Sequence, residues 1–349
     1  MGETPEALAK YIQDLAGPAA AEVGETYERA LELTYRLDDR NLFAILSGAW
    51  VFHVVRGDLE KARRFGIEFL KATERHPAPG LALAGNFVVG SSLYHLGRLE
   101  AAFEHMNRAI RMHAGPAESV LTLFAGPDLG VFCHAYMAHI AWHRGEEGRA
   151  REEAAAAIAA AERMRHPFSQ AIALDYAAML HVFAGESGAA LERGLEAVEL
   201  CGRHGFAYYL AVANVMTGWA RAAEGDLTRG LSQLREGLEG LRQLAAELRL
   251  PYYFALLAEA LGNGGQVGEA LASLSTAFAF ATKNGEEWAV AELHRVQGDL
   301  LKAEGKHEAA RASYRRGIEA AQRSGSVAFE QRLLNRVGGT AGGASTERF

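Results

Sequence analysis

Glycine returns at a nearly constant interval along the whole chain. It occupies positions 17, 57, 97, 145, 185, 225, 265 and 305, so every step is 40 residues except one of 48. A small residue follows most of these glycines after five positions, as Ala62 follows Gly57 and Ala190 follows Gly185. A fixed period of this size indicates one supersecondary unit that is copied and stacked, each unit contacting its neighbours.

One unit, residues 169–201, shows what is being copied. Residues 169–184 carry apolar side chains at helical spacing and stop at Gly185, where the left-handed end of a helix suits glycine. A second amphipathic stretch then runs over residues 187–200, which predicts an antiparallel helical hairpin with a tight turn. The next unit repeats the pattern, and Asp226 is placed to cap its second helix.

The predicted fold is therefore all-α. We expect a right-handed superhelical solenoid of about eight such hairpins with a period of 40 residues, in one domain that covers residues 1–337. Residues 326–337 are predicted to form a C-terminal capping helix, and residues 338–349 a disordered tail. Six of the eight prolines fall between hairpins, which agrees with the exclusion of proline from helix interiors. Small residues midway along the first helices, such as Gly218, should let the two helices of a hairpin approach closely.

Composition narrows the class of protein. Apolar residues make up 49% and charged residues 23%, which is ordinary for a soluble domain. The net charge of −7 and the scattered basic residues argue against nucleic-acid binding. Cys133 and Cys201 are predicted to be buried, reduced thiols. Without a signal-peptide pattern or an apolar run long enough for a bilayer, the sequence predicts a cytoplasmic protein with no membrane contact.

The unit resembles the tetratricopeptide (TPR) repeat, lengthened from about 34 to 40 residues. Residues 42–62, 80–102, 251–274 and 286–301 resemble the C-terminal helical region of bacterial signalling proteins. Those proteins join an adenylate-cyclase-type or other effector domain to an AAA/STAND-type ATPase and a TPR array related to the maltose-system activator. The similarity runs from about Ala19 to about Leu301 and implies the interaction or regulatory part, because the phosphate loop and the metal-binding aspartate pair are not found.

The inner surface of such an array is lined by the first helix of each unit. Reading the positions that lie ten, six, three and two residues before each turn glycine gives an aromatic and histidine-rich centre, a composition typical of binding hot spots. The alternative is that a strongly curved superhelix buries some of these rings. The predicted groove consists of Phe87, Tyr94, His95, Asp128, Phe132, His139, Trp142, His143, Asp175, Met179, Trp219, Tyr252, Glu259 and Arg295.

The one irregular unit lies between Gly97 and Gly145. Its eight extra residues fall in a segment rich in glycine and proline, residues 113–130. Asp128 is expected to cap a helix that starts near Leu129. The other interpretation is that this loop folds over the concave mouth and helps to hold a ligand.

No arrangement for catalysis is visible. His139 and His143 share a helix face four residues apart and His134 lies nearby, but nothing on that face completes a metal site. A nucleophile with its base is also not found, so we predict no enzyme activity, no cofactor and no metal, and a hydrolase or transferase is the least favoured class.

The leading function is a non-catalytic module that binds a protein or peptide in its concave groove, with ATPase or cyclase modules of the same system among the partners. The alternative is a small-molecule sensor, by analogy with the sugar-binding helical region of the maltose-system activator. Its pocket would lie near the irregular third unit and be lined by Phe132, His139, Trp142 and Asp175.

Overall fold

Helices account for almost all of the chain that the computed structural model describes, residues 42–75, 80–113 and 128–338. These ranges contain fifteen helices and no strand. The helices are α3 (Leu42–Val55), α4 (Leu59–Arg75), α5 (Leu81–His95), α6 (Leu99–His113), α7 (Leu129–His143), α8 (Glu147–Met164), α9 (Pro167–Ala184), α10 (Ser187–His204), α11 (Ala207–Ala223), α12 (Leu227–Gln243), α13 (Leu250–Asn263), α14 (Val267–Asn284), α15 (Val290–Ala303), α16 (His307–Ser324) and α17 (Val327–Gly338).

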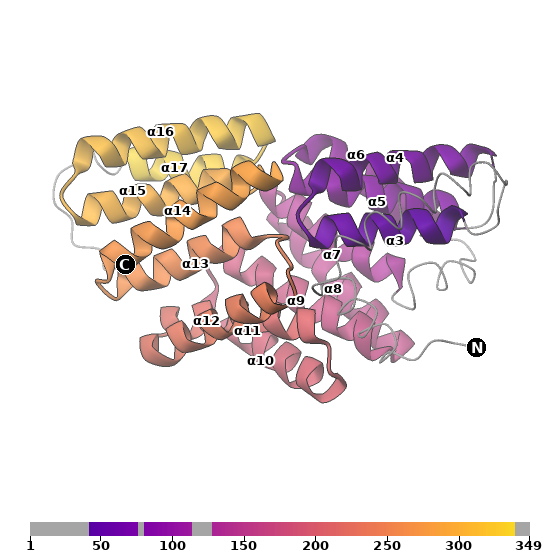
Figure 1. The fold of residues 1–349 in the computed structure, drawn as a ribbon, viewed down its shortest axis with the longest axis horizontal. Coiled ribbons are helices and arrows are strands. Elements are labelled where there is room, and N and C mark those ends of the chain that lie inside the picture. Colours follow the sequence, from indigo (N-terminus) through magenta and orange to yellow (C-terminus); the bar gives the residue numbers. More distant parts are fainter. Residues whose placement is uncertain (1–41, 76–79, 114–127, 339–349) are drawn as a thin grey trace.

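Helices α3 to α16 form seven antiparallel hairpins, and α17 follows the last of them (Figure 1). Every turn glycine within the described ranges has a positive φ, between 69° and 97°, as expected for the end of a first helix. The predicted all-α repeat solenoid is confirmed. The expectations for the unit at Gly17, for the loop over residues 114–127 and for the tail after 338 lie outside the described residues.

The two helices of a hairpin differ in burial because they occupy different layers. In α7 nearly all residues are buried, whereas α8 buries only three alanines, Ala150, Ala157 and Ala161. Close approach within a hairpin depends on small residues: a Cβ atom at Gly218 of α11 would lie 2.8 Å from the carbonyl oxygen of Gly230 in α12. The first helices thus form an inner layer and the second helices an outer one.

The superhelix closes on itself. In Figure 1 the early hairpins, drawn in indigo and purple, lie beside the late ones in orange and yellow. Two main-chain hydrogen bonds run from the amides of Glu247 and Leu248 to the carbonyl of Val55, at 2.9 and 3.2 Å. One unit further along, the amide of Glu287 donates to the carbonyl of His95 at 3.2 Å. Segments that join late hairpins therefore dock onto the turns of early hairpins.

This closure keeps a constant register. Val55 and Glu247 are 192 residues apart, and so are His95 and Glu287. At the third contact His143 Nδ1 lies 2.9 Å from Ser326 Oγ, 183 residues later. Eight of the nine residues by which this span is shorter are the extra residues of the irregular unit, which precede His143. Each span of 192 residues includes the eight extra residues of the irregular unit, so 184 residues follow the 40-residue period and one superhelical turn takes between four and five hairpins. Helix α17 continues the seam, and Arg332 donates to the carbonyl of Phe183.

The docking segments 245–249 and 285–289 have a local cause. Residues at the ends of second helices adopt left-handed conformations with the same period of 40, at Arg165, Gly205, Ala245, Gly285 and Gly325. Helices α9, α11 and α17 begin two residues after this position, whereas α13 and α15 begin five residues after it. Before α13 and α15 the chain is therefore free to lie across the turns of α3–α4 and α5–α6.

Two further sequence expectations concern the thiols and the membrane. Cys133 and Cys201 are both buried and free, as predicted. Among the described helices, none combines the length and the apolar character that crossing a bilayer requires.

Candidate ligand-binding centre

Most of the predicted groove residues lie inside the closed superhelix. Asp128, Phe132 and Glu259 are partly exposed. The buried ones are Phe87, Tyr94, His95, His139, Trp142, His143, Asp175, Met179, Trp219, Tyr252 and Arg295. The expectation that these side chains face solvent is therefore wrong for the structure, and the alternative that the curved superhelix buries them describes it better. The physical reason is the tight closure, which turns the first helices toward one another and covers them with the docking segments. Their role in binding stays a prediction.

Aromatic rings from distant units meet around Trp288, which is fully buried in the docking segment 285–289. Its ring stacks on Tyr94 with centroids 5.4 Å apart and lies 5.1 Å from the ring of Tyr252. Phe183 lies 5.7 Å from the same indole and 5.4 Å from the ring of His143. Residues of α5, α7, α9 and α13 thus share one centre with a segment that connects α14 to α15.

Glu286 is the buried acid of this centre. Its carboxylate accepts hydrogen bonds from the backbone amide of Arg249, at 3.0 and 3.1 Å, and from the indole of Trp288, at 2.6 Å. His95 Nδ1 lies 3.5 Å from the same carboxylate. Burial raises the pKa of Glu286 to about 7, although these donors favour the charged form.

Three buried histidines surround the aromatic cluster. His95 Nε2 is 3.0 Å from the hydroxyl of Tyr136, and His139 Nε2 donates to the carbonyl of Tyr176 at 2.8 Å. His143 contacts Ser326 and, through Nε2 at 3.4 Å, the hydroxyl of Tyr94. Burial lowers the pKa of each, and that of His143 falls to about 3. All three rings are therefore neutral at neutral pH.

The helix that carries His134, His139 and His143 gathers no metal site. His134 is 2.6 Å from Glu153 of α8, while the other two rings bind Tyr176 and Ser326 on separate elements. Over the described ranges, no group of three or more histidine, cysteine or acidic side chains is placed to hold a metal ion.

The charged residues of the last units form ion pairs with one another. Arg295 contacts Glu292, Glu259 and Asp299, and Glu292 in turn pairs with Arg332 of α17 at 3.2 Å. Glu259 also accepts a 2.7 Å hydrogen bond from the indole of Trp219. These predicted groove residues therefore form an ion-pair network that ties α11, α13, α15 and α17 together.

Asp175 of α9 and Arg249 are different, because polar atoms of both side chains lack hydrogen-bond partners. Both are buried, with exposed fractions of 2% and 3%. Neither oxygen of Asp175 has a hydrogen-bond partner, and neither do Nε and Nη2 of Arg249. Burial raises the pKa of Asp175 well above its ordinary value, and the charge of Arg249 lowers it only in part. Buried polar and charged groups without partners are costly, so these two side chains are the exceptional feature of the centre.

Asp128 caps α7, as the sequence predicts. Its carboxylate accepts from the amide of Val131 at 3.0 Å and lies 3.4 Å from Nε2 of His113. We expect Asp128→Ala to lower the free energy of unfolding by about 1 kcal/mol and Asp128→Asn to retain most of that stability. Asp226→Ala removes the equivalent cap of α12 and is the matched comparison in urea unfolding, with a loss of similar size expected. An unchanged midpoint for Asp128→Ala would contradict the capping role.

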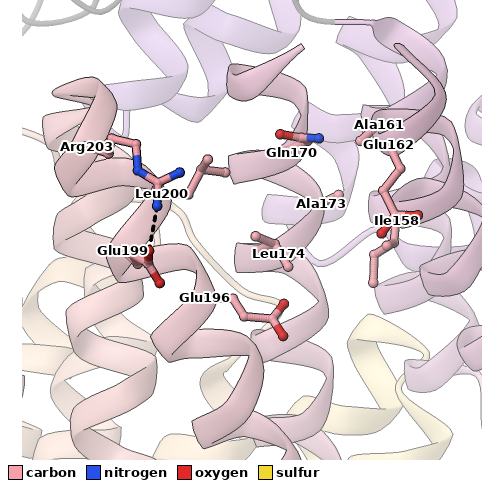
Figure 2. A pocket seen from close by; sticks show the side chains of 10 residues that line it. All are labelled: Ile158, Ala161, Glu162, Gln170, Ala173, Leu174, Glu196, Glu199, Leu200 and Arg203. Carbon is pink, nitrogen blue, oxygen red and sulfur yellow. Dashed lines mark hydrogen bonds and ion pairs between the residues drawn. The ribbon is translucent and has the colours of Figure 1, made fainter. Parts of the chain in front are cut away.

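Hollows on the surface lie apart from this centre. One encloses about 270 Å³ on the outer side, where α8, α9 and α10 diverge (Figure 2). Glu196 and Glu199 line it together with Arg203, which pairs with Glu199. Another, of about 520 Å³, lies at the seam between α17 and the turns of α7–α8 and α9–α10, and Trp142 is the predicted groove residue that lines it.

Sequence reasoning missed the residues supplied by the docking segments and one inner helix position. Three residues of the centre lie in connections between helices: Arg249, Glu286 and Trp288. Counting positions back from a turn glycine covers only the first helix of a unit, so it does not predict that these residues point inward. Tyr136 and Tyr176 lie nine residues before their turn glycines, a position that is not among the four used to predict the groove. Pro251 could have signalled the first docking segment, because it keeps α13 from starting much earlier.

Comparison with known proteins gives structural matches but no family. No protein-family model matches the chain. A protein of Rhizobium meliloti (strain 1021) described as uncharacterized is 24% identical over 336 residues, which are 95% of this chain but 32% of that protein. The chain thus spans about a third of the length of the curated relative that it matches.

Three solved structures share the architecture over nearly the whole of both chains. A Rap protein complexed with competence and sporulation factor has a TM-score of 0.57 at 14% identity, covering 97% of this chain and 99% of that one. The Rap conjugation gene regulator of plasmid pLS20, in complex with the Phr* peptide, gives 0.61 at 12%, with 93% and 97% covered. NprR in complex with its cognate peptide NprX gives 0.59 at 13%, with 96% and 98% covered. These likenesses show a TPR-type helical repeat fold.

Proposed function

We propose that this chain is a non-catalytic regulatory module that binds a peptide or protein segment inside its superhelix. The observation that carries the proposal is the end-to-end match of one closed superhelix to solved structures that hold peptides: a Rap regulator with the Phr* peptide and NprR with NprX. The buried centre of this chain, with its aromatic rings and unpaired polar groups, supports the same use of the interior.

A segment can reach the interior only if the seam opens. The two docking segments contact the early turns through three main-chain hydrogen bonds, and Trp288 of the second segment stacks on Tyr94, so opening the seam means breaking these contacts. A ligand that binds one seam state better than the other shifts the balance between them. Binding inside and a change of shape outside are thereby coupled, which is what a regulatory module needs.

We also propose that the chain is the helical part of a longer signalling protein, with ATPase or cyclase modules in the same system. The resemblance in sequence and the 32% coverage of the curated relative support this. The native open reading frame tests it: coding sequence for such modules in frame with this chain is the expected result, and a gene that encodes this chain alone would contradict it.

Selection from a displayed library of random twelve-residue peptides tests the binding function. We expect enriched sequences that bind the folded chain. Hydrogen exchange with the selected peptide should slow at the amides of residues 245–249 and 285–289 and in α9, because these line the centre. The unfolded chain in urea is the control. A selection without enrichment, or protection confined to the outer helices such as α10 and α12, would refute the proposal.

A small-molecule sensor is the second candidate, favoured by the unpartnered carboxylate of Asp175. This residue belongs to the pocket predicted from the sequence, and so does His139, whose Nδ1 also lacks a partner. A thermal-shift screen with a metabolite collection tests it. A hit that is lost in Asp175→Asn would support the sensor, and no shift with any compound would reject it.

A further inference from the structure

Arg249 has an unusual backbone. It precedes α13 with φ of 65°, one of three residues other than glycine with positive φ in the described ranges. A side chain in this region costs about 1 kcal/mol or more, and such strain persists where surrounding contacts hold it. The contacts here are the two hydrogen bonds from its amide to Glu286. Holding this residue at the centre thus lowers the stability of the fold by the cost of the left-handed backbone.

The guanidinium lies against two aromatic rings, and one edge of it has no partner within the chain. Its Cζ lies 4.5 Å from the ring centre of Tyr176 and 5.6 Å from that of Tyr136. The two nitrogens without partners, Nε and Nη2, lie side by side along one edge of the planar group. That edge forms the parallel pair of N–H donors that binds a carboxylate through both oxygens.

The group that Arg249 could use within the chain does not pair with it. Asp175 is close enough for its pKa to respond to Arg249, yet both of its oxygens and the Arg249 edge stay without partners. The hydroxyl of Tyr253 lies beside Arg249, whose charge offsets part of the rise in the pKa of Tyr253 that burial causes. The carboxyl of Asp175 and the Nε–Nη2 edge of Arg249 are thus both left without a partner inside the chain.

Arg295 shows that the same chain can satisfy a buried arginine. It is 5% exposed and contacts three carboxylates, from Glu259, Glu292 and Asp299. A purely structural role for Arg249 would call for a similar arrangement. The free edge therefore points to a ligand group rather than to a packing need.

We propose that Arg249 and Asp175 bind a carboxylate flanked by a nitrogen donor, the chemistry of the C-terminal residue of a peptide and of a free amino acid. The Arg249 edge receives the carboxylate, and Asp175 accepts from the adjacent N–H. The rings of Tyr136 and Tyr176 lie against the guanidinium. This inference rests on the proposed binding inside the superhelix and names the end of the segment that is held.

Retention of defined pools by the full chain tests the inference. The pools are random pentapeptides with free C-termini, the same pentapeptides amidated at the C-terminus, and the twenty free amino acids, with retention measured by ultrafiltration and mass spectrometry. Free C-termini should be retained at least about tenfold better than amides, because a charge-assisted pair is lost in the amide. Arg249→Lys, which keeps the charge but not the paired donors, and Asp175→Asn should each weaken retention about 10- to 100-fold. Arg235→Lys, at an exposed ion pair with Glu269, should change nothing.

The outcomes separate this inference from the proposed function. Equal retention of free and amidated peptides would overturn the carboxylate site while peptide binding stood. Retention of free amino acids alone would confirm the site and contradict peptide binding. If no pool is retained, the site is refuted, whereas the selection with longer peptides still decides the broader function.

Thermal unfolding without ligand gives a second, independent test. Replacing an unpaired buried cation removes an unmet desolvation cost, so Arg249→Met should unfold at an equal or higher Tm than the wild type. If Arg249 instead formed a structural ion pair with Asp175, Arg249→Met would leave a buried carboxylate alone and Tm would fall by several degrees. That fall would overturn the inference.

Discussion

Gly97→Ala is expected to lower the free energy of unfolding by about 3 kcal/mol. Two effects add. Gly97 has φ of 69°, a conformation that costs alanine about 1 kcal/mol. Its Cβ atom would also lie 2.8 Å from Cβ of Glu287 and 3.2 Å from the backbone nitrogen of Trp288, so the second docking segment would have to move. Such overpacking typically costs 1–3 kcal/mol.

Gly265→Ala is the matched control for this substitution. Gly265 occupies the same turn position with φ of 73°, but a Cβ atom there meets nothing within 4 Å. It should therefore lose only the conformational part, about 1 kcal/mol. Urea unfolding of both variants measures the difference, which isolates the docking of residues 285–289. Equal losses would show that the seam contributes nothing to stability.

Acidification should act on the buried centre in two opposing directions, which His143 and Glu286 represent. His143, with its pKa lowered to about 3, stays neutral in the folded chain while the unfolded chain takes up a proton near pH 6.5. Its contribution to stability is thus present above pH 6.5 and is lost as the pH falls toward 3. Between pH 7 and pH 5 the loss is about 2 kcal/mol. His143→Gln should remove that part of the pH dependence.

Glu286 works in the opposite direction. Its pKa is raised to about 7, so the folded chain binds a proton that the unfolded chain binds only near pH 4.5. The stability that it contributes is present below pH 4.5 and is lost as the pH rises through 7. From pH 7 to pH 5 the wild type therefore regains about 2 kcal/mol from this group. Glu286→Gln should make the chain more sensitive to acid, whereas His143→Gln should make it less so.

Urea unfolding at pH 7, 6 and 5 measures both effects as changes of slope relative to the wild type. Each slope is compared within one variant, so a general loss of stability from the substitution itself cancels. The polar and titratable groups near His143 are Tyr94, His139, Glu292, Ser326 and Arg332, and none of them is changed. If both variants changed the slope of stability against pH in the same direction relative to the wild type, the assignment of opposite pKa shifts to His143 and Glu286 would be contradicted.

The sequence was sufficient for the hairpins but not for their closure. The turns at Gly57 to Gly305, the cap at Asp128 and the helix over 327–338 depend on local chemistry within a few residues, and each is found in the structure. The contact of Gly97 with Glu287 and Trp288 depends on the summed twist of between four and five units. No local pattern reports that sum, so the sequence suggested an open groove where the structure has a filled centre.

The candidate site illustrates the same limit. Asp175 was named from its position in the first helix of its unit, and the structure finds it buried without a partner. Arg249 was not named, because it lies in a connection and reaches the centre only through a left-handed backbone and the docking of that connection. Half of the site therefore follows from periodicity. The other half follows from tertiary contacts that periodicity cannot describe.

The fixed register between early turns and late connections restricts how such a gene can evolve. Open repeat arrays gain or lose a unit at little cost, because each unit contacts only its neighbours. Here the deletion of any hairpin between Gly97 and Glu287 would present the wrong connection to that glycine. Duplication would do the same. The array is thus expected to behave as a ring with a set number of members, in which change is confined to substitutions and to short insertions in its loops.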